Sequence, residues 1–290
     1  MSDSKTVDSK VTLLVSCDDR PGLVAALAQA LYNQGANILD VDQHTDSESG
    51  RFFQRIHFDL AESRTDRLTL EGAISDVAQP LEMAWRIVYG DRLARLAIFV
   101  SKTNHCLYDL LLRHQAGDLR CEIPLIVSNH PDQAPVAEQF GIPYRVVPIA
   151  KETRAEQEAR QLALLSEYRI DLAVLARYMQ VLSGEFLDRF DRPVINIHHS
   201  FLPAFSGGRP YHQAYERGVK LIGATAHYAT RDLDEGPIIA QDAIRASHRH
   251  SVADLVRKGR DVERTTLSRA VRCHLENRVL VHGNKTVVFE

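Results

Sequence analysis

The chain has 290 residues, of which 44% are hydrophobic and 25% are charged, and its formal net charge is −3. This composition is typical of a globular protein with enough apolar material for one large or two ordinary domains. A nearly neutral chain has no general attraction to nucleic acid or to anionic membranes. No apolar stretch approaches the roughly 20 residues that a membrane span needs. We therefore expect no nucleic acid and no membrane as partners.

The cysteines are scattered without the C-x-x-C spacing of a redox or zinc motif. They are Cys17, Cys106, Cys121 and Cys273. This pattern fits a reducing compartment and argues against a disulfide framework and a structural zinc site. Residues 1–9 are polar and lack the apolar core of a secretion signal. We expect a disordered tail, a cytoplasmic location, no bound metal and no resident cofactor.

The first part of the chain, residues 10–89, predicts two helices and four strands in the order β-α-β-β-α-β. The expected elements are a strand at 11–17, a helix from Leu23 that stops at Gly35, strands at 37–46 and 50–60, a helix at 68–83 and a strand at 84–90. Helical spacing of leucine and alanine marks the first helix, and alternation marks the strands. This order within about 80 residues is the ferredoxin-like pattern.

Residues 19–38, "DRPGLVAALAQALYNQGANI", open the first helix with a D-x-P-G-L turn. The stretch resembles the ACT domain family of small ligand-binding modules. The resemblance implies a regulatory turn that binds a small amino acid, often across a dimer interface, at Asp19, Arg20, Pro21, Gly22 and Leu23. It also implies a homodimer or homotetramer. A docking domain without a ligand remains an alternative.

A short charged connector, residues 90–94, is followed by regular alternation of strands and helices from residue 95 to the end of the chain. Strands are expected at 95–101, 121–129, 143–149, 170–178 and 192–200, and helices at 106–117, 134–141, 152–168 and 183–190. Such alternation predicts a Rossmann-like α/β domain with a mostly parallel, doubly wound sheet. The expected division is a tail at 1–9, domains at 10–89 and 95–290, and a linker between them.

The strand that ends in "VINIHHSFLP" (194–203) carries polar residues at its carboxyl end. Asn196 and His198 are two residues apart, so a strand directs both side chains to one face. Ligand sites of open α/β sheets form at the carboxyl ends of strands. An isolated pair of this kind can also be two hydrogen-bonded residues at a strand end. A strand ending at His227 and a loop with Asp234 follow, and a carboxylate of that loop could face His198.

Three segments, "NIHHSFLP" (196–203), "GATAH" (223–227) and "DLDEGPI" (232–238), occur in order. Together they resemble the active-site segment of the folate-dependent formyltransferase family, over about residues 94–285. The resemblance implies that Asn196 and His198 hydrogen-bond the formyl oxygen as it becomes an oxyanion, and that Asp234 manages protons. These roles suit a poorly electrophilic formamide, which needs donors aimed at the developing charge.

Further site residues follow from the same resemblance. His227 would lie near the formyl group or the water, although a structural role for it stays open. His199 stands where the transferases often have proline, and would position a water or fill acceptor space. The pterin would lie against the segment 176–186 and the loop 229–234. The implied folate-binding residues are Met179, Gln180, Val181, Leu182 and Thr230, of which Val181 and Leu182 can also pack in the core.

The acceptor of the formyl group distinguishes members of this family. The glycinamide ribonucleotide enzymes cradle a phosphate in a glycine-rich loop, whereas residues 99–111 here contain no glycine. We also expect no basic domain for tRNA. An ACT domain joined to a formyltransferase-like domain closely resembles the 10-formyltetrahydrofolate deformylases, hydrolases that use water as acceptor. The two glycines of the loop 206–210 could widen the acceptor side.

The resemblance implies hydrolysis of 10-formyltetrahydrofolate to formate and tetrahydrofolate. This reaction would feed formate to purine synthesis and balance the one-carbon folate pool. Methionine or glycine would then be a reasonable effector of the ACT domain. Two alternatives stay open, which are a formyltransferase that acts on a small amine and a non-catalytic sensor of folate or amino acids.

Overall fold

The computed structural model describes residues 9–204 and 210–290. The chain divides into two compact units. The first comprises the residues up to Leu93 with Asn277–Leu280 and Val287–Glu290, and the second comprises Ala94–Glu276 with Val281–Thr286. The domain boundaries expected from the sequence stay a prediction, and nearly all of the expected tail lies outside the described residues.

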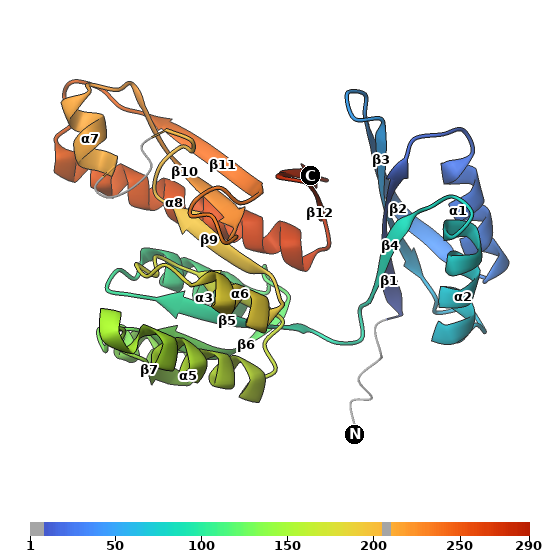
Figure 1. The fold of residues 1–290 in the computed structure, drawn as a ribbon, viewed down its shortest axis with the longest axis horizontal. Coiled ribbons are helices and arrows are strands. Elements are labelled where there is room, and N and C mark those ends of the chain that lie inside the picture. The colour runs from blue at the N-terminus through green and yellow to red at the C-terminus, as the bar shows by residue number, and fades with distance from the viewer. Residues whose placement is uncertain (1–8, 205–209) are drawn as a thin grey trace. The chain divides into compact units, whose positions relative to one another are not determined.

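The first unit is a four-stranded antiparallel sheet in the order β2-β3-β1-β4. Its strands are β1 (Lys10–Asp18), β2 (Asn37–Asp46), β3 (Arg51–Asp59) and β4 (Ala84–Tyr89). Helices α1 (Leu23–Asn33) and α2 (Arg67–Ala78) cover one face (Figure 1). Their leucines pack with alternate residues of β1 and β3 in a single core. The predicted ferredoxin-like arrangement is confirmed.

Helix α2 is shorter than predicted, because it ends at Ala78 and not near residue 83. Pro80 lies two residues beyond this end. Proline lacks the N–H that a helix needs and disfavours helical geometry in the residue before it. The chain therefore turns, and Met83 enters the core just before β4 begins.

The second unit is a seven-stranded sheet in the order β11-β10-β9-β8-β5-β6-β7. Its strands are β5 (Ala94–Val100), β6 (Cys121–Ser128), β7 (Tyr144–Val146), β8 (Leu172–Leu175), β9 (Val194–His198), β10 (Leu221–Tyr228) and β11 (Ile238–Arg245). The five strands from β9 to β7 are parallel, and β10 runs antiparallel to both β9 and β11. The predicted mostly parallel α/β sheet is confirmed.

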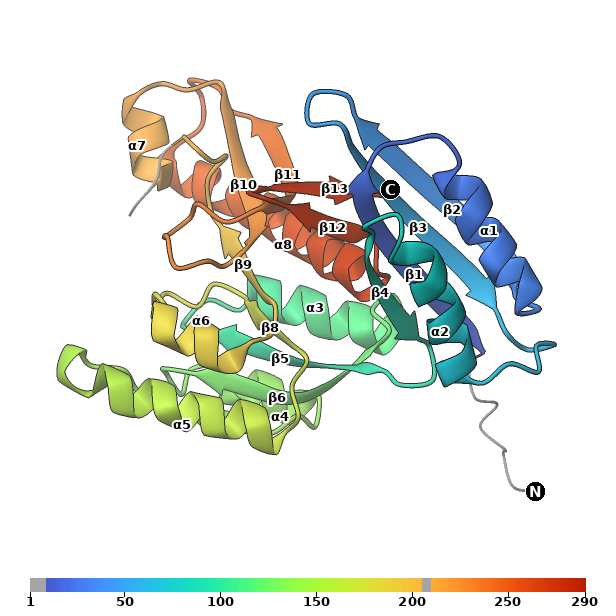
Figure 2. The same cartoon turned by 45° about the vertical axis from the view of Figure 1, so that its right-hand side comes forward.

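Helices cover both faces of this sheet (Figures 1 and 2). They are α3 (His105–Ala116), α4 (Ala134–Gln139), α5 (Arg154–Glu167), α6 (Gly184–Phe190), α7 (Pro210–Glu216) and α8 (Val252–Leu275), with a 3₁₀ turn η1 (Lys151–Thr153) before α5. Helices α5 and α6 share a core with one face of the sheet. Helix α8 packs against α3 and against β9, β10 and β11 on the other face.

The sequence did not predict α8, the helix of 24 residues that covers the end of the sheet. Its start carries a clear signal, because Ser251 and Asp254 form a capping box. The sequence also missed a hairpin formed by β12 (Val279–His282) and β13 (Lys285–Val288). In the described part of the chain, none of the helices is long and apolar enough to cross a membrane.

Strand β8 is also shorter than the predicted 170–178. It ends at Leu175, and Arg177 takes a left-handed conformation with φ 64°. A residue in this conformation cannot continue a strand. The segment that follows, residues 176–183, is therefore a loop at the carboxyl edge of the sheet.

Candidate active site

Two neighbouring strands bring Asn196, His198 and His227 to one face of the sheet. In the register of β9 and β10, Asn196 pairs with His227 and His198 pairs with Thr225. Directly paired residues of antiparallel strands share a face, and so do residues two apart on one strand. The three polar side chains therefore meet at the carboxyl end of β9, where α/β sheets form their sites.

The loop between β10 and β11 supplies the carboxylate of Asp234. Gly236 makes this loop possible, because a Cβ there would lie 1.8 Å from the Tyr228 carbonyl oxygen. Asp234 itself has φ 59°, a left-handed conformation that aspartate tolerates better than most residues. The sharp turn folds the loop back over the sheet and returns the carboxylate to the two histidines.

Asp234 and His198 form a close acid–imidazole pair. Asp234 Oδ2 lies 3.2 Å from His198 Nδ1, and Oδ1 lies 3.7 Å from His227 Nε2. The hydrogen bond from His198 holds the pKa of Asp234 well below its usual range. Asp234 is therefore ionised at neutral pH, and it fixes a proton on His198 Nδ1.

The second nitrogen of His198 is buried without a partner. The residue is 5% exposed, and its Nε2 has no hydrogen-bond partner among the described residues. A buried polar atom that lacks a partner costs free energy. Such an atom, on a ring already oriented by a carboxylate, is suited to meet a substrate atom.

His227 sets the orientation of the Asn196 amide. Its Nδ1 lies 3.0 Å from the Tyr228 carbonyl oxygen, which can only accept, so Nδ1 carries the proton. In the neutral ring Nε2 is then an acceptor, and Asn196 Nδ2 lies 3.2 Å from it. Asn196 thus donates one amide N–H to His227, and its other N–H can donate to a substrate oxygen.

Thr225 holds the turn that follows His198. Its hydroxyl accepts from Leu202 N at 3.0 Å and donates to the Ser200 carbonyl at 2.9 Å. Gln241 on β11 donates to the Leu202 carbonyl at 3.0 Å. Thr225 is fully buried. These bonds fix the chain that leaves β9, and with it the direction of the two histidines.

His199 follows His198 but belongs to different surroundings. Its ring centroid lies 5.2 Å from that of His198 and 6.2 Å from that of Tyr211 on α7. Burial, together with the positive charge of Arg177, lowers the pKa of His199 to about 3. The ring is therefore neutral at physiological pH, and it is an uncharged neighbour of the His198–Asp234 pair.

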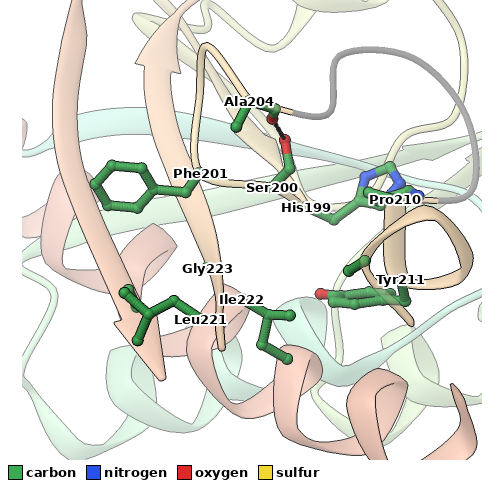
Figure 3. Close-up of a pocket in the computed structure, with 11 residues that line it drawn as sticks. His199, Ser200, Phe201, Ala204, Pro210, Tyr211, Leu221, Ile222 and Gly223 are labelled. Carbon is green, nitrogen blue, oxygen red and sulfur yellow. Dashed lines mark hydrogen bonds between the residues drawn. The ribbon is translucent and has the colours of Figure 1, made fainter. Parts of the chain in front are cut away.

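A cavity of about 250 Å³ lies beside His199, with Phe201, Tyr211 and Ile222 among its apolar walls (Figure 3). The residues that line it do not include Asn196, His198 or Asp234. The cavity therefore lies beside His199 and is not lined by these three residues. Its wall includes Ala204 and Pro210, which flank residues outside the described part of the chain.

A second polar cluster, which the sequence did not predict, centres on Glu263 of α8. Glu263 is 1% exposed, accepts from the Tyr211 hydroxyl at 2.5 Å, and lies 2.7 Å from His105 Nε2. Arg177 Nε is 3.4 Å from the same carboxylate. Burial would raise the pKa of Glu263, but the bond from His105 and the charge of Arg177 outweigh it and lower that pKa. The cluster is a buried ion pair.

Three groups of this cluster also have the spacing of a metal site. One ligand atom each of His105, Cys106 and Glu263 lies within 4.8 Å of the others. The guanidinium of Arg177 already supplies positive charge to Glu263, which disfavours a cation there. Burial also raises the pKa of the Cys106 thiol well above its usual range, so it is neither a ready ligand nor a nucleophile.

The residues expected to bind folate lie in the loop 176–183 and in the loop after β10. Met179 and Val181 are exposed, by 56% and 51%, whereas Leu182 is buried in the core under α6. Met179 N donates to Ser101 Oγ at 3.0 Å. Thr230 donates to the Asp232 carbonyl. These contacts order the two loops, and Gln180 lies between the exposed pair. The role of all five in folate binding stays a prediction.

The expected regulatory turn lies at the start of α1 in the first unit. Gly22, with φ 95°, is the residue before the helix. Asp19 N donates to the Gly50 carbonyl at 2.8 Å, which ties the turn to the β2–β3 hairpin. Asp19, Pro21 and Gly22 are exposed and Arg20 is half-buried, whereas Leu23 is buried in the core. Four residues of the turn are thus accessible, and Leu23 anchors it.

Comparisons with known proteins agree with this architecture. The formyl transferase family matches residues 94–271, and the ACT domain family matches residues 11–71. A formyltetrahydrofolate deformylase from Synechocystis sp. is 57% identical over 278 residues, which are 96% of this chain and 98% of that protein. The chain belongs to the formyltetrahydrofolate deformylase family. The resemblance seen in the sequence is confirmed.

Solved structures extend this comparison. A deformylase structure from Pseudomonas syringae has a TM-score of 0.93 and 43% identity, and the match covers 97% of this chain and 94% of that one. A glycinamide ribonucleotide transformylase from Symbiobacterium toebii matches with a TM-score of 0.65 and 28% identity, over 70% of this chain and 97% of that one. The deformylase family thus shares its catalytic fold with transferases, and adds a unit to it.

Proposed function

We propose that this enzyme hydrolyses 10-formyltetrahydrofolate to formate and tetrahydrofolate, with water as the formyl acceptor. The observation that carries this proposal is the His198–Asp234 pair, whose free Nε2 lies on the same face as the spare amide N–H of Asn196. Two such groups provide an oxyanion site for a tetrahedral intermediate. Membership of the deformylase family supports the choice of reaction.

The proposed reaction needs no group beyond those of the chain and the substrate. Water adds to the formyl carbon, and the formyl oxygen takes the negative charge between Asn196 Nδ2 and the protonated Nε2 of His198. Asp234 stabilises the imidazolium and accepts the proton of the water. The carbon–nitrogen bond then breaks as the proton passes from Asp234 to N10. Tetrahydrofolate and formic acid leave, and formic acid releases its proton to solvent to give formate.

The loop before α3 supports water over a phosphorylated amine as acceptor. Residues 101–104, all of which the structure describes, contain no residue with positive φ. A backbone nest for phosphate needs alternating right- and left-handed residues. The first turn of α3 instead directs His105 to the carboxylate of Glu263.

Further parts of the proposal rest on the family and on the composition. The four cysteines are free thiols, which supports a cytoplasmic enzyme. The first unit would act as an amino-acid-responsive regulatory domain, with methionine or glycine as effector and a homodimer or homotetramer as the assembly. We place the domain boundary in the segment 90–94. Formate for purine synthesis and balance of the folate pool would be the metabolic outcome.

The test is formate release from 10-formyltetrahydrofolate in a buffer without any amine, for wild type and for His198→Ala. We expect rapid release by wild type and a loss of about a thousandfold in the variant. Release that begins only when an amine is added would assign the enzyme to the transferases. Binding of folate without turnover by wild type would favour a sensor.

A further inference from the structure

Glu158 of α5 is a buried carboxylate that binds the residue before α6 with both of its oxygens. Ser183 N donates to Glu158 Oε1 at 3.0 Å, and Ser183 Oγ donates to Oε2. Arg154, one helical turn before Glu158, donates to Oε1 at 3.1 Å. The side chain of Glu158 is 9% exposed. Hydrogen bonds to a buried carboxylate are strong and directional, so Glu158 fixes the place where α6 begins.

Ser183 connects this carboxylate to α6. Its hydroxyl also accepts from Phe186 N at 3.0 Å, so Ser183 is the N-cap of the helix. Phe186 is 1% exposed and lies in the core that α6 shares with the sheet. The position of α6 is therefore set by the bonds of its cap and by the packing of its buried side.

Helix α6 contacts the loop that carries Asp234. Arg231, three residues before Asp234, forms an ion pair with Asp188 of α6. The start of α6 is also close to this side chain, because a Cβ on Gly184 would lie 3.1 Å from Arg231 Cγ. Ala229, where the loop begins, packs against the core that α6 shares with the sheet. The loop of the carboxylate therefore rests on α6.

The loop between β8 and α6 is held by the same face of α5. Arg154 Nη2 donates to the Val181 carbonyl at 2.5 Å. Gln161, which is fully buried, donates from Nε2 to the Tyr178 hydroxyl at 2.8 Å. Arg154, Glu158 and Gln161 are four and three residues apart, so they lie on one face of the helix. This face anchors the loop, and it anchors α6 at the end of the loop.

A misplacement of about 1 Å that starts far from the reacting atoms can cost about a hundredfold in rate. From these contacts, and on the basis of the proposed hydrolysis, we infer that Glu158 and Arg231 are positioning residues of the formyl site. Glu158 holds α6 through Ser183. Helix α6 in turn holds Arg231, and this contact keeps Asp234 at 3.2 Å from His198.

The first test measures hydrogen exchange of residues 229–235 in the free full-length enzyme. We expect these amides to exchange at least about threefold faster in Arg231→Ala and in Glu158→Gln than in wild type. Glu156→Gln, at an exposed ion pair of the same helix, is the matched control and should leave their exchange unchanged. The Arg231 ion pair is also exposed, so Arg231→Ala should fold normally. Unchanged exchange in either of the first two variants would overturn the inference.

The second test measures kcat for formate release from 10-formyltetrahydrofolate, well below the unfolding temperature of each variant. We expect kcat to fall at least about tenfold in Glu158→Gln and in Ser183→Ala. Ser183→Thr keeps the hydroxyl and should restore kcat to within about twofold of wild type. A residue that only stabilises the fold would lower the unfolding temperature and leave kcat of the folded enzyme unchanged. Glu156→Gln is again the control.

The double variant Glu158→Gln/Arg231→Ala tests whether the two residues act on one loop. Its kcat should be no more than about twofold below that of the slower single variant, because coupled residues are not additive. Losses that multiply, unchanged kcat in Glu158→Gln, or equal losses in Ser183→Ala and Ser183→Thr would overturn the inference. Absence of formate release by wild type would instead refute the hydrolysis, and the exchange test would still decide on the loop.

Discussion

Asp234 and Glu263 are two carboxylates of the second unit that each accept a bond from a histidine, but they are used differently. Asp234 binds His198 Nδ1 and leaves the other nitrogen of that ring without a partner. Glu263 has both oxygens occupied, by Tyr211 and His105. At Asp234, the His198 ring keeps one nitrogen available for a substrate. At Glu263, both carboxylate oxygens are used by hydrogen bonds within the protein.

The two carboxylates also differ in burial and in what holds them. The side chain of Asp234 is 11% exposed and sits on a loop, whereas that of Glu263 is 1% exposed on a long helix. A fully buried charge loses most of its hydration, so it depends on its partners. We therefore expect loss of Asp234 to affect catalysis more than stability, and loss of Glu263 to have the opposite balance.

The largest expected effect is that of Asp234→Asn on turnover. The amide cannot hold the His198 imidazolium or accept a proton, so kcat should fall by about a thousandfold or more. Stability should fall as well, because the depressed pKa of Asp234 shows that its charge stabilises the fold, but by less than in Glu263→Gln, since the side chain is less buried. Formate release measures the first effect and thermal unfolding the second. Asp232→Asn, in the same loop and exposed, is the control, and a loss of less than tenfold in Asp234→Asn would contradict the assigned role.

Glu263→Gln should reverse this balance. The amide leaves Arg177 as a buried cation without a counterion, which costs about 3 kcal/mol or more of unfolding free energy. We expect kcat to change by less than about tenfold. Urea unfolding followed by circular dichroism measures the cost. Glu185→Gln, at an exposed ion pair, should cost less than about 0.5 kcal/mol. Equal costs in the two variants would refute a buried charge cluster.

The Asp234 cluster could be anticipated from the sequence because its residues lie at strand ends. Asn196 and His198 lie two residues apart at the carboxyl end of β9, where α/β sheets form their sites. His227 lies on the antiparallel strand β10, and only the family resemblance placed it near the site. Asp234 lies two residues before Gly236, and this glycine marks the sharp turn. The strand pattern therefore indicated the Asn196–His198 pair, and the family resemblance added Asp234 and His227. The tautomer of His227 and the free Nε2 of His198 needed the structure.

The Glu263 cluster could not be anticipated in the same way. Its hydrogen bond to His105 joins residues 158 apart in the chain, and no local motif connects them. The sequence predicts a strand that includes Arg177. Arginine rarely adopts the left-handed conformation, so its residue type gives no signal of the turn there. Gly259 lies inside the continuous helix α8, and its low helix propensity weakens the helical signal of the sequence.

Gly259 offers a sharper test of the Glu263 cluster. A Cβ at this position would lie 2.0 Å from the Tyr211 hydroxyl oxygen, so Gly259→Ala should displace Tyr211 from Glu263. We expect a loss of about 1–3 kcal/mol, despite the better helix propensity of alanine. Hydrogen exchange of the α8 amides measures this loss of stability. Gly72→Ala in α2, where a Cβ meets nothing within 4 Å, should slow exchange in its own helix instead. Protection in both helices would contradict the packing argument.

Substitution of His199, whose neighbours belong to both clusters, should have the smallest effect. It should change the pH dependence of the unfolding free energy. The folded pKa of His199, about 3, lies below the ordinary value of 6.5, so only the unfolded chain takes up a proton between these values. This contribution to stability is complete above about pH 6.5 and falls as the pH drops toward 3, by at most about 1.4 kcal/mol per unit. His199→Gln lacks it. The stability of wild type relative to this variant should therefore decline by at most about 2.5 kcal/mol between pH 7 and pH 4.5. Urea unfolding at several pH values measures the decline, with exposed His248→Gln as the matched substitution. Parallel curves for wild type and His199→Gln would show that the ring is accessible to protons in the folded enzyme.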